Sequence, residues 1–140
     1  MTAKEYLSQI KEIDQQIGRM QRRRDALRAS LYSLGSPAGS MNADKVQTTV
    51  SGDKMLRLIA QADEMELDIV RETLRLRQEQ ARIAEQIEGL SDQRYRTILH
   101  DRYVLCYKWE QIARGMRMDE RWVYRLHGQA LQAFADRYLN

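Results

Sequence analysis

The chain has 140 residues with only one proline, seven glycines and one cysteine, which excludes a loop-rich fold and an internal disulfide and leads us to expect an all-α protein. No apolar run approaches the roughly 20 residues that cross a bilayer, and no signal-peptide core follows the N-terminus, so we expect no membrane partner and a cytoplasmic location. The formal net charge is only +3, but residues 1–34 are basic, 53–90 acidic and 91–140 basic again, and a basic C-terminal segment suits a phosphate backbone.

Residues 2–34 predict a long first helix with a narrow apolar seam. Apolar side chains recur there at the steps of three and four that define a heptad repeat, and the series skips Arg24. The seam consists of Tyr6, Ile10, Ile13, Ile17, Met20, Leu27, Leu31 and Leu34. Arg24 either fixes the register of helix pairing or extends its charged end to the edge of the seam, and both interpretations stay open. The arginines between Arg19 and Arg28 favour a solvated flank over a DNA contact.

Residues 35–52 interrupt this pattern with glycine, serine and proline and predict a flexible linker. A second long helix is expected from Asp53 to Gly89, with two adjoining apolar stripes. The first stripe contains Ile59, Ala62, Ile69, Leu76, Ile83, Ile87 and Leu90. The second contains Leu67, Val70, Leu74, Ala81 and Ala84. Two stripes imply contact with more than one helix, so we expect residues 1–90 to form an antiparallel two-helix coiled-coil arm. This arm is expected to make the protein a homodimer or to dock it on another protein.

Residues 91–140 carry the bipartite pattern of a helix-turn-helix domain with three or four helices. Ser91 is expected to cap the first of them, and Gly115 is expected to turn the chain at a positive φ angle after a short helix that starts near Trp109. Asp119 is placed to cap the next helix. Ile112 and Ala113 of the short helix are expected to contact the inward face of the last one, which consists of Val123, Leu126, Ala130 and Phe134.

The opposite face of the last helix predicts contacts with the edges of bases in the major groove. The candidate base readers are Glu120, Arg121, Trp122 and Arg125. Arginine can bind guanine through two hydrogen bonds, and a tryptophan can pack on the methyl group of thymine. Lys108, Arg114 and Arg117 flank this helix and suit phosphate groups, which fix the register of a protein on DNA. The alternative is an ordinary capped helix start with Trp122 in the core.

Residues 90–135 resemble region 4 of sigma-70-type sigma factors. The match is carried by the segments Trp109–Ala113 and Val123–Leu131. The whole chain, including Lys45–Gln47 before the second long helix, resembles the small phage-encoded transcriptional regulators of the RinA/ArpU type. Such regulators occur in phages and prophages of Gram-positive bacteria.

The resemblance implies a sequence-specific regulator that activates phage genes in the cytoplasm of the bacterial host cell. Double-stranded DNA is its implied partner, and host RNA polymerase is a second candidate. The implied base readers are the same four residues, and Tyr124 and Gln129 join the implied backbone contacts. Residues 1–90 lack the further domain with which a sigma factor melts DNA, which argues against an autonomous sigma factor.

Two other functions stay open. A small terminase subunit for DNA packaging also joins a helix-turn-helix to a coiled-coil oligomerisation segment, and a protein-interaction module could bind host RNA polymerase without reading DNA. His100 and His127 lack a cluster of carboxylates or cysteines, and Cys106 has no base at helical spacing. We therefore expect no catalytic residue, no metal, no cofactor and no enzyme activity.

Overall fold

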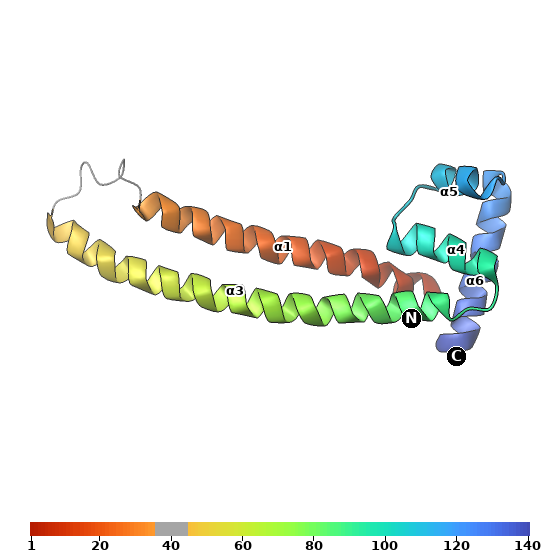
Figure 1. Ribbon diagram of the computed structural model, residues 1–140, viewed down its shortest axis with the longest axis horizontal. Helices are drawn as coiled ribbons and strands as arrows, with labels where there is room; N and C mark the ends of the chain where they lie inside the picture. Colours follow the sequence, from red (N-terminus) through yellow and green to blue (C-terminus); the bar gives the residue numbers. More distant parts are fainter. Residues whose placement is uncertain (36–44) are drawn as a thin grey trace. The chain divides into compact units, whose positions relative to one another are not determined.

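The computed structural model describes residues 1–35 and 45–140, and this part of the chain folds into helices and loops without a strand (Figure 1). The expected all-α class is therefore confirmed. In chain order the elements are α1 (Ala3–Gly35), α3 (Lys45–Glu88), α4 (Gln93–Leu99), the π-helical turn η1 (His100–Val104), α5 (Trp109–Met116) and α6 (Glu120–Tyr138). Among the described helices, none has an apolar stretch long enough to cross a membrane.

The chain divides into two compact units. Unit 1 consists of Met1–Gln15 together with Leu76–Asn140, and unit 2 consists of Gln16–Arg75. Both long helices contribute to both units. The domain boundary expected between residues 90 and 91 lies within unit 1, because the start of α1 and the end of α3 share a core with the C-terminal helices.

The core of unit 1 draws on every helix of that unit. Leu7 of α1, Ile87 of α3 and Phe134 of α6 are completely buried in one apolar cluster. The Tyr6 ring lies 5.7 Å from the Phe134 ring, and the Tyr6 hydroxyl donates a hydrogen bond to Gln86 Oε1 over 2.6 Å. The predicted seam includes Tyr6 but omits Leu7, whose burial shows that helices surround the start of α1 on more than one side. The inward face predicted for α6 is confirmed, since Val123, Leu126, Ala130 and Phe134 are all buried.

Two helix boundaries in unit 1 differ from the sequence expectation. Ser91 does not cap α4, because the helix begins one residue later and Asp92 accepts the Arg94 backbone N–H over 2.8 Å. A carboxylate at this position satisfies an amide that has no partner within the helix. Gly89 does follow the last residue of α3 as expected, yet its φ angle is not positive. A Cβ atom there would collide with the Tyr138 hydroxyl group, so the glycine serves close packing of α6.

The turn between α5 and α6 also corrects the expectation for Gly115. This glycine is the seventh residue of α5, and the left-handed residue that ends the helix is Arg117, with a φ angle of 56°. The backbone N–H of Met118 donates to the Ala113 carbonyl over 3.0 Å, which closes the end of α5. The hydrogen bond that closes the helix requires a left-handed residue directly after its last residue. Arg117 occupies this position, although glycine fits it best.

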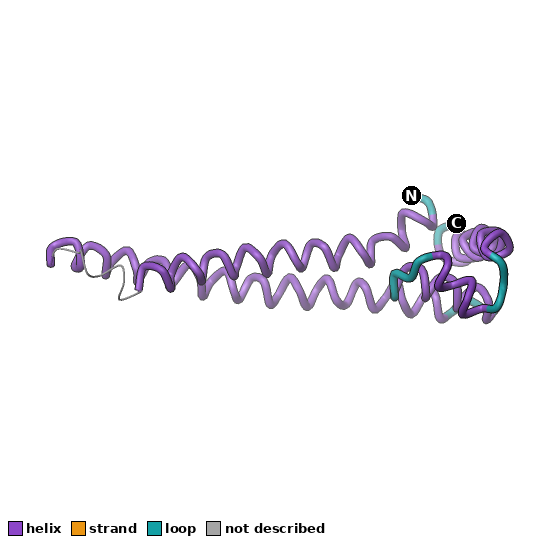
Figure 2. The backbone as a smooth tube through the Cα atoms, turned by 90° about the horizontal axis from the view of Figure 1, so that it is seen from above, coloured by secondary structure: helices purple, strands orange, loops and turns teal. Residues whose placement is uncertain are grey.

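Unit 2 contains two antiparallel helical segments that lie side by side (Figures 1 and 2). Ile17 of α1 and Ala62 and Ile69 of α3 are buried, and Arg28 forms an ion pair with Glu66. Arg24 is partly buried, and its guanidinium group donates to the Asp25 carboxylate. The coiled-coil character of the pairing stays a prediction.

Helix occupies both ends of the range predicted as a linker. α1 continues through Gly35, and α3 begins at Lys45 rather than at Asp53. No proline stands between Lys45 and Gly52, and one glycine costs a helix only about 1 kcal/mol, so α3 extends upstream. The remainder of the predicted linker, residues 36–44, lies outside the described residues.

We predict that Gly115→Ala stabilises the protein by about 1 kcal/mol, because the residue is helical and exposed and a Cβ atom there meets no atom within 4 Å. Gly128→Ala in α6 is the matched control, since it is equally open and helical. The measurement is the midpoint of urea unfolding. If Gly115 had a positive φ angle, its alanine variant would lower the midpoint while the control raised it.

Candidate nucleic-acid interface

The candidate site is built on α5, α6 and the turn between them, which comprises Arg117, Met118 and Asp119. Ile112 and Ala113 of α5 are buried in the same apolar cluster as the inward face of α6. The Asp119 carboxylate accepts the Trp122 backbone N–H over 2.8 Å, which confirms the expected cap. At the start of α5 the Gln111 side chain accepts the Lys108 backbone N–H over 3.0 Å. Each bond satisfies one of the backbone amides that lack a partner at a helix start, and the Asp119 cap marks where α6 begins.

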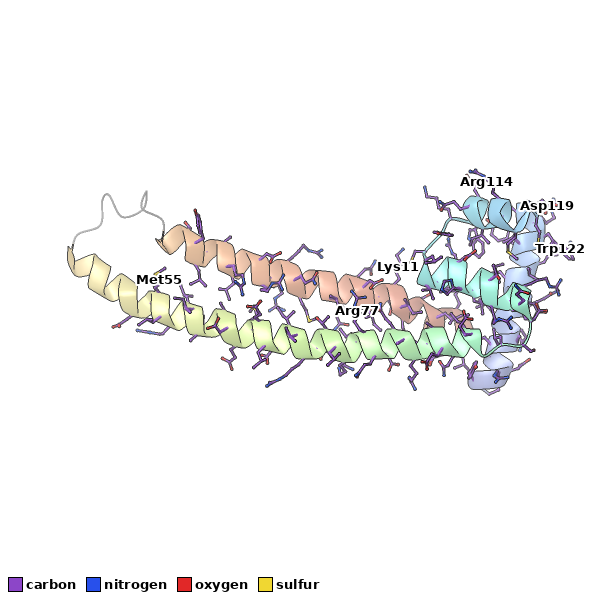
Figure 3. The ribbon with its side chains drawn as sticks, in the orientation of Figure 1. Lys11, Met55, Arg77, Arg114, Asp119 and Trp122 are labelled. Atoms are coloured by element: carbon purple, nitrogen blue, oxygen red, sulfur yellow. The ribbon has the colours of Figure 1, made fainter. Side chains whose placement is uncertain are left out.

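The first two turns of α6 present an exposed polar and aromatic face. The four candidate base readers are all exposed, while their neighbours Val123 and Leu126 are buried. Trp122 is 46% exposed, which excludes the alternative that its side chain belongs to the core. Figure 3 labels Asp119 and Trp122 near the start of α6 and Arg114 on α5. Arg121 and Arg125 are four residues apart and therefore lie on one face of the helix.

The candidate backbone contacts lie around this face and are exposed as well. Lys108 is the residue before α5, Arg114 lies in the last turn of α5, and Arg117 lies in the inter-helix turn. Gln129 continues the row of Arg121 and Arg125 along α6, but its Oε1 atom accepts the Tyr95 hydroxyl group at a long 3.4 Å. Five exposed basic side chains thus come from α5, from the residues that flank it and from the start of α6. The described part of the chain holds no cluster of three His, Cys, Asp or Glu residues that could bind a metal ion.

An aromatic network that helical periodicity does not predict packs behind the candidate site. The Trp109 ring lies 5.0 Å from the Tyr124 ring and 4.6 Å from the His127 ring. The Arg102 guanidinium group lies over the Trp109 ring at 4.4 Å, close enough for a cation–π interaction. Tyr124, expected to contact the DNA backbone, is 48% exposed although its ring packs on Trp109. The spacing of Tyr124 and His127, three residues apart in a helix, was the signal that could have revealed a shared face.

His127 is a packing residue that stays neutral. Its Nε2 atom lies 2.8 Å from the Tyr103 hydroxyl group, which links α6 to η1. The pKa of His127 is lowered to about 4, first by burial and then by the positive charges of Lys4 and Arg102. Burial likewise raises the pKa of Tyr103 to about 12. At neutral pH the tyrosine therefore keeps its proton and can donate it to an uncharged imidazole.

A family model described as "Protein of unknown function (DUF1492)" matches residues 34–135, which is more than half of the chain. The chain belongs to this family. The match includes all nine candidate DNA-contacting residues. No curated protein and no solved structure matches the chain.

We predict that the free energy of unfolding falls as the solution becomes acidic and that His127 contributes to this fall. Its pKa is lower in the folded than in the unfolded chain, so the unfolded chain binds more protons between about pH 6.5 and pH 4. The stabilising contribution is fully present above pH 6.5 and is lost as the pH falls through about 4. Urea unfolding at pH 7.5 and 4.5 should show a loss for the protein that exceeds the loss for His127→Gln, by on the order of 1 kcal/mol for a half-buried ring. Equal losses for the two proteins would contradict the neutral, buried imidazole.

Proposed function

We propose that this protein is a sequence-specific DNA-binding transcriptional regulator in which α5 and α6 act as a helix-turn-helix. The observation that carries the proposal is the exposed face at the start of α6, which presents Arg121, Trp122 and Arg125 beside a firmly capped turn. A recognition helix reads bases with the residues of its first turns. The resemblance of residues 90–135 to sigma region 4 supports the same assignment.

In this proposal α6 enters the major groove, and the protein contacts both the bases and the backbone of the DNA. Arg121 and Arg125 bind guanine edges, Glu120 accepts from an amino group of cytosine, and Trp122 packs on a thymine methyl group. Lys108, Arg114, Arg117, Tyr124 and Gln129 contact the backbone, which sets the register without selecting a sequence. The resemblance to regulators of the RinA/ArpU type supports activation of phage genes in the cytoplasm of a bacterial host, with host RNA polymerase as a second partner.

We further propose that the regulator is a homodimer formed through α3. Leu56, Leu67, Val70 and Leu74 are between 50% and 66% exposed and follow heptad spacing on unit 2. If two copies pair antiparallel with Leu67 against the partner's Val70, Glu64 comes to lie near the partner's Arg71. Opposite charges beside an apolar seam favour pairing of a chain with itself. A homodimer that binds DNA reads two half-sites about 10 base pairs apart, or a multiple of that distance.

The exposed aromatic rings of Trp122 and Tyr124 support one alternative function. Aromatic side chains are enriched at the centres of protein interfaces, so the same face could bind host RNA polymerase as a protein-interaction module. The regulator is favoured because two arginines one helical turn apart flank Trp122 on this face. A packaging protein of the small terminase type shares the helix-turn-helix and differs in its oligomeric state.

We predict that the protein enriches a defined motif from random duplex DNA and that Arg121→Ala with Arg125→Ala abolishes the preference. Each good bidentate contact with guanine gives about 1–3 kcal/mol of discrimination, roughly 5- to 150-fold. Lys54→Gln with Arg57→Gln, on exposed positions of unit 2, removes the same charge and should leave the motif unchanged. An unchanged preference in the double alanine variant would refute the base-reader assignment. Absence of any motif for the unaltered protein would refute the regulator.

We predict that the protein has the mass of a dimer in sedimentation equilibrium and that Leu67→Glu with Leu74→Glu gives monomers. Both positions are exposed on unit 2, so the substitution leaves the fold intact while it places charges in the proposed seam. Leu105→Glu, exposed on unit 1, is the control that should remain dimeric. A monomeric parent protein contradicts the dimer, and eight or more copies favour the packaging function.

A further inference from the structure

A cationic pocket lies in unit 1, outside the nine candidate DNA contacts. Lys4, Ser8 and Lys11 of α1 form one wall, and Arg102, Cys106 and Trp109 line the other side of a hollow of about 250 Å³. Lys4 and Lys11 are seven residues apart, so both side chains project from the same face of α1. Figure 3 labels Lys11 on this part of α1. The pocket therefore brings together the beginning of the chain and the segment before α5.

Among the described residues, the positive charges of this pocket have no ion-pair partner. No carboxylate lines it, and the ion pairs found among the described residues include none with Lys4, Lys11 or Arg102. The positive charges of Lys4 and Arg102 both contribute to the lowered pKa of His127, so the two charges act on the same region of unit 1. Three cations without a carboxylate gain free energy when an anion binds among them.

The donors in the pocket suit a phosphate group. The Ser8 hydroxyl group donates to the Lys4 carbonyl over 2.6 Å, so the ligand contacts come from the three cations. Arg102 is held in place by the Trp109 ring and by a 2.9 Å hydrogen bond from Nη1 to the Tyr107 carbonyl, which uses one of its five N–H donors. Two flexible lysines beside one fixed arginine provide charge without shape selectivity, as a contact with a nucleic-acid backbone requires.

We infer that Lys4, Lys11 and Arg102 form a phosphate-binding pocket that takes a backbone phosphate of the DNA whose bases α6 reads. This inference rests on the proposed function. Trp109 connects the pocket with α6, because its ring contacts both Arg102 and Tyr124. Lys108, a proposed backbone contact, directly precedes Trp109 in the chain. The duplex would thus be held by residues from both ends of the chain.

The test compares salt dependence of DNA binding for the full chain and for Lys4→Gln with Lys11→Gln. Each phosphate neutralised contributes about 0.9 to the slope of the logarithm of the binding constant against the logarithm of the salt concentration. We expect the double variant to reduce this slope by about 1 and to weaken binding to the selected motif and to random DNA by the same factor. Both lysines are exposed, so the fold should persist, and Lys54→Gln with Arg57→Gln is the control of equal charge.

The outcomes separate this inference from the proposed function. A slope that is equal in the double glutamine variant and its control overturns the pocket, even if the unaltered protein keeps its motif. A protein without any DNA motif overturns the proposed function. Inorganic phosphate is the second probe of the pocket, since it carries the same charged group as the DNA backbone but belongs to no duplex. The measurement is the NMR signal of the Trp109 indole N–H at equal ionic strength. If millimolar phosphate shifts this signal as strongly as a selected duplex does, the pocket binds free phosphate, and the proposed backbone contact is overturned.

Discussion

The apolar core around Phe134 is the constraint on which the rest of unit 1 depends. Its members come from Leu7 near the start of the chain, from Ile83 and Ile87 at the end of α3, and from all C-terminal helices. The helices α4 and α5 have only seven and eight residues, which is too short for a helix to be stable alone in water. The short helices therefore owe their stability to packing against α6 and to the apolar cluster that they share with the ends of the two long helices.

This core fixes the geometry of the candidate interface before any ligand arrives. The side chains of Val123 and Leu126 at the start of α6 are buried in the core. The Asp119 carboxylate caps the helix, and the Trp109 ring of α5 packs against it. A recognition surface on a helix held in this way loses little conformational freedom on binding, which favours affinity and a defined register. The exposed side chains of that surface remain free to adapt to a partner.

Periodicity predicted the elements well because it depends only on local spacing. The inward face of α6 and the cap at Asp119 follow from helical repeats and from the chemistry of a helix start. Details that depend on distant packing were missed. Leu7 is buried because other helices approach α1 from a second side, and the left-handed turn falls on Arg117 rather than Gly115 because a closing hydrogen bond to Ala113 requires it. The network of Tyr103, Trp109 and His127 joins separate elements, so no single repeat could reveal it.

The neutral state of His127 explains how unit 1 tolerates its concentration of positive charge. A protonated imidazole would add a further cation near Lys4 and Arg102, whereas the neutral ring lies within hydrogen-bond distance of the Tyr103 hydroxyl group and packs against Trp109. Like charges gathered without carboxylates reduce the stability of a fold. Burial of His127 limits this cost, since it removes one charge from the cluster, in which Lys4 and Lys11 are exposed and Arg102 is partly buried.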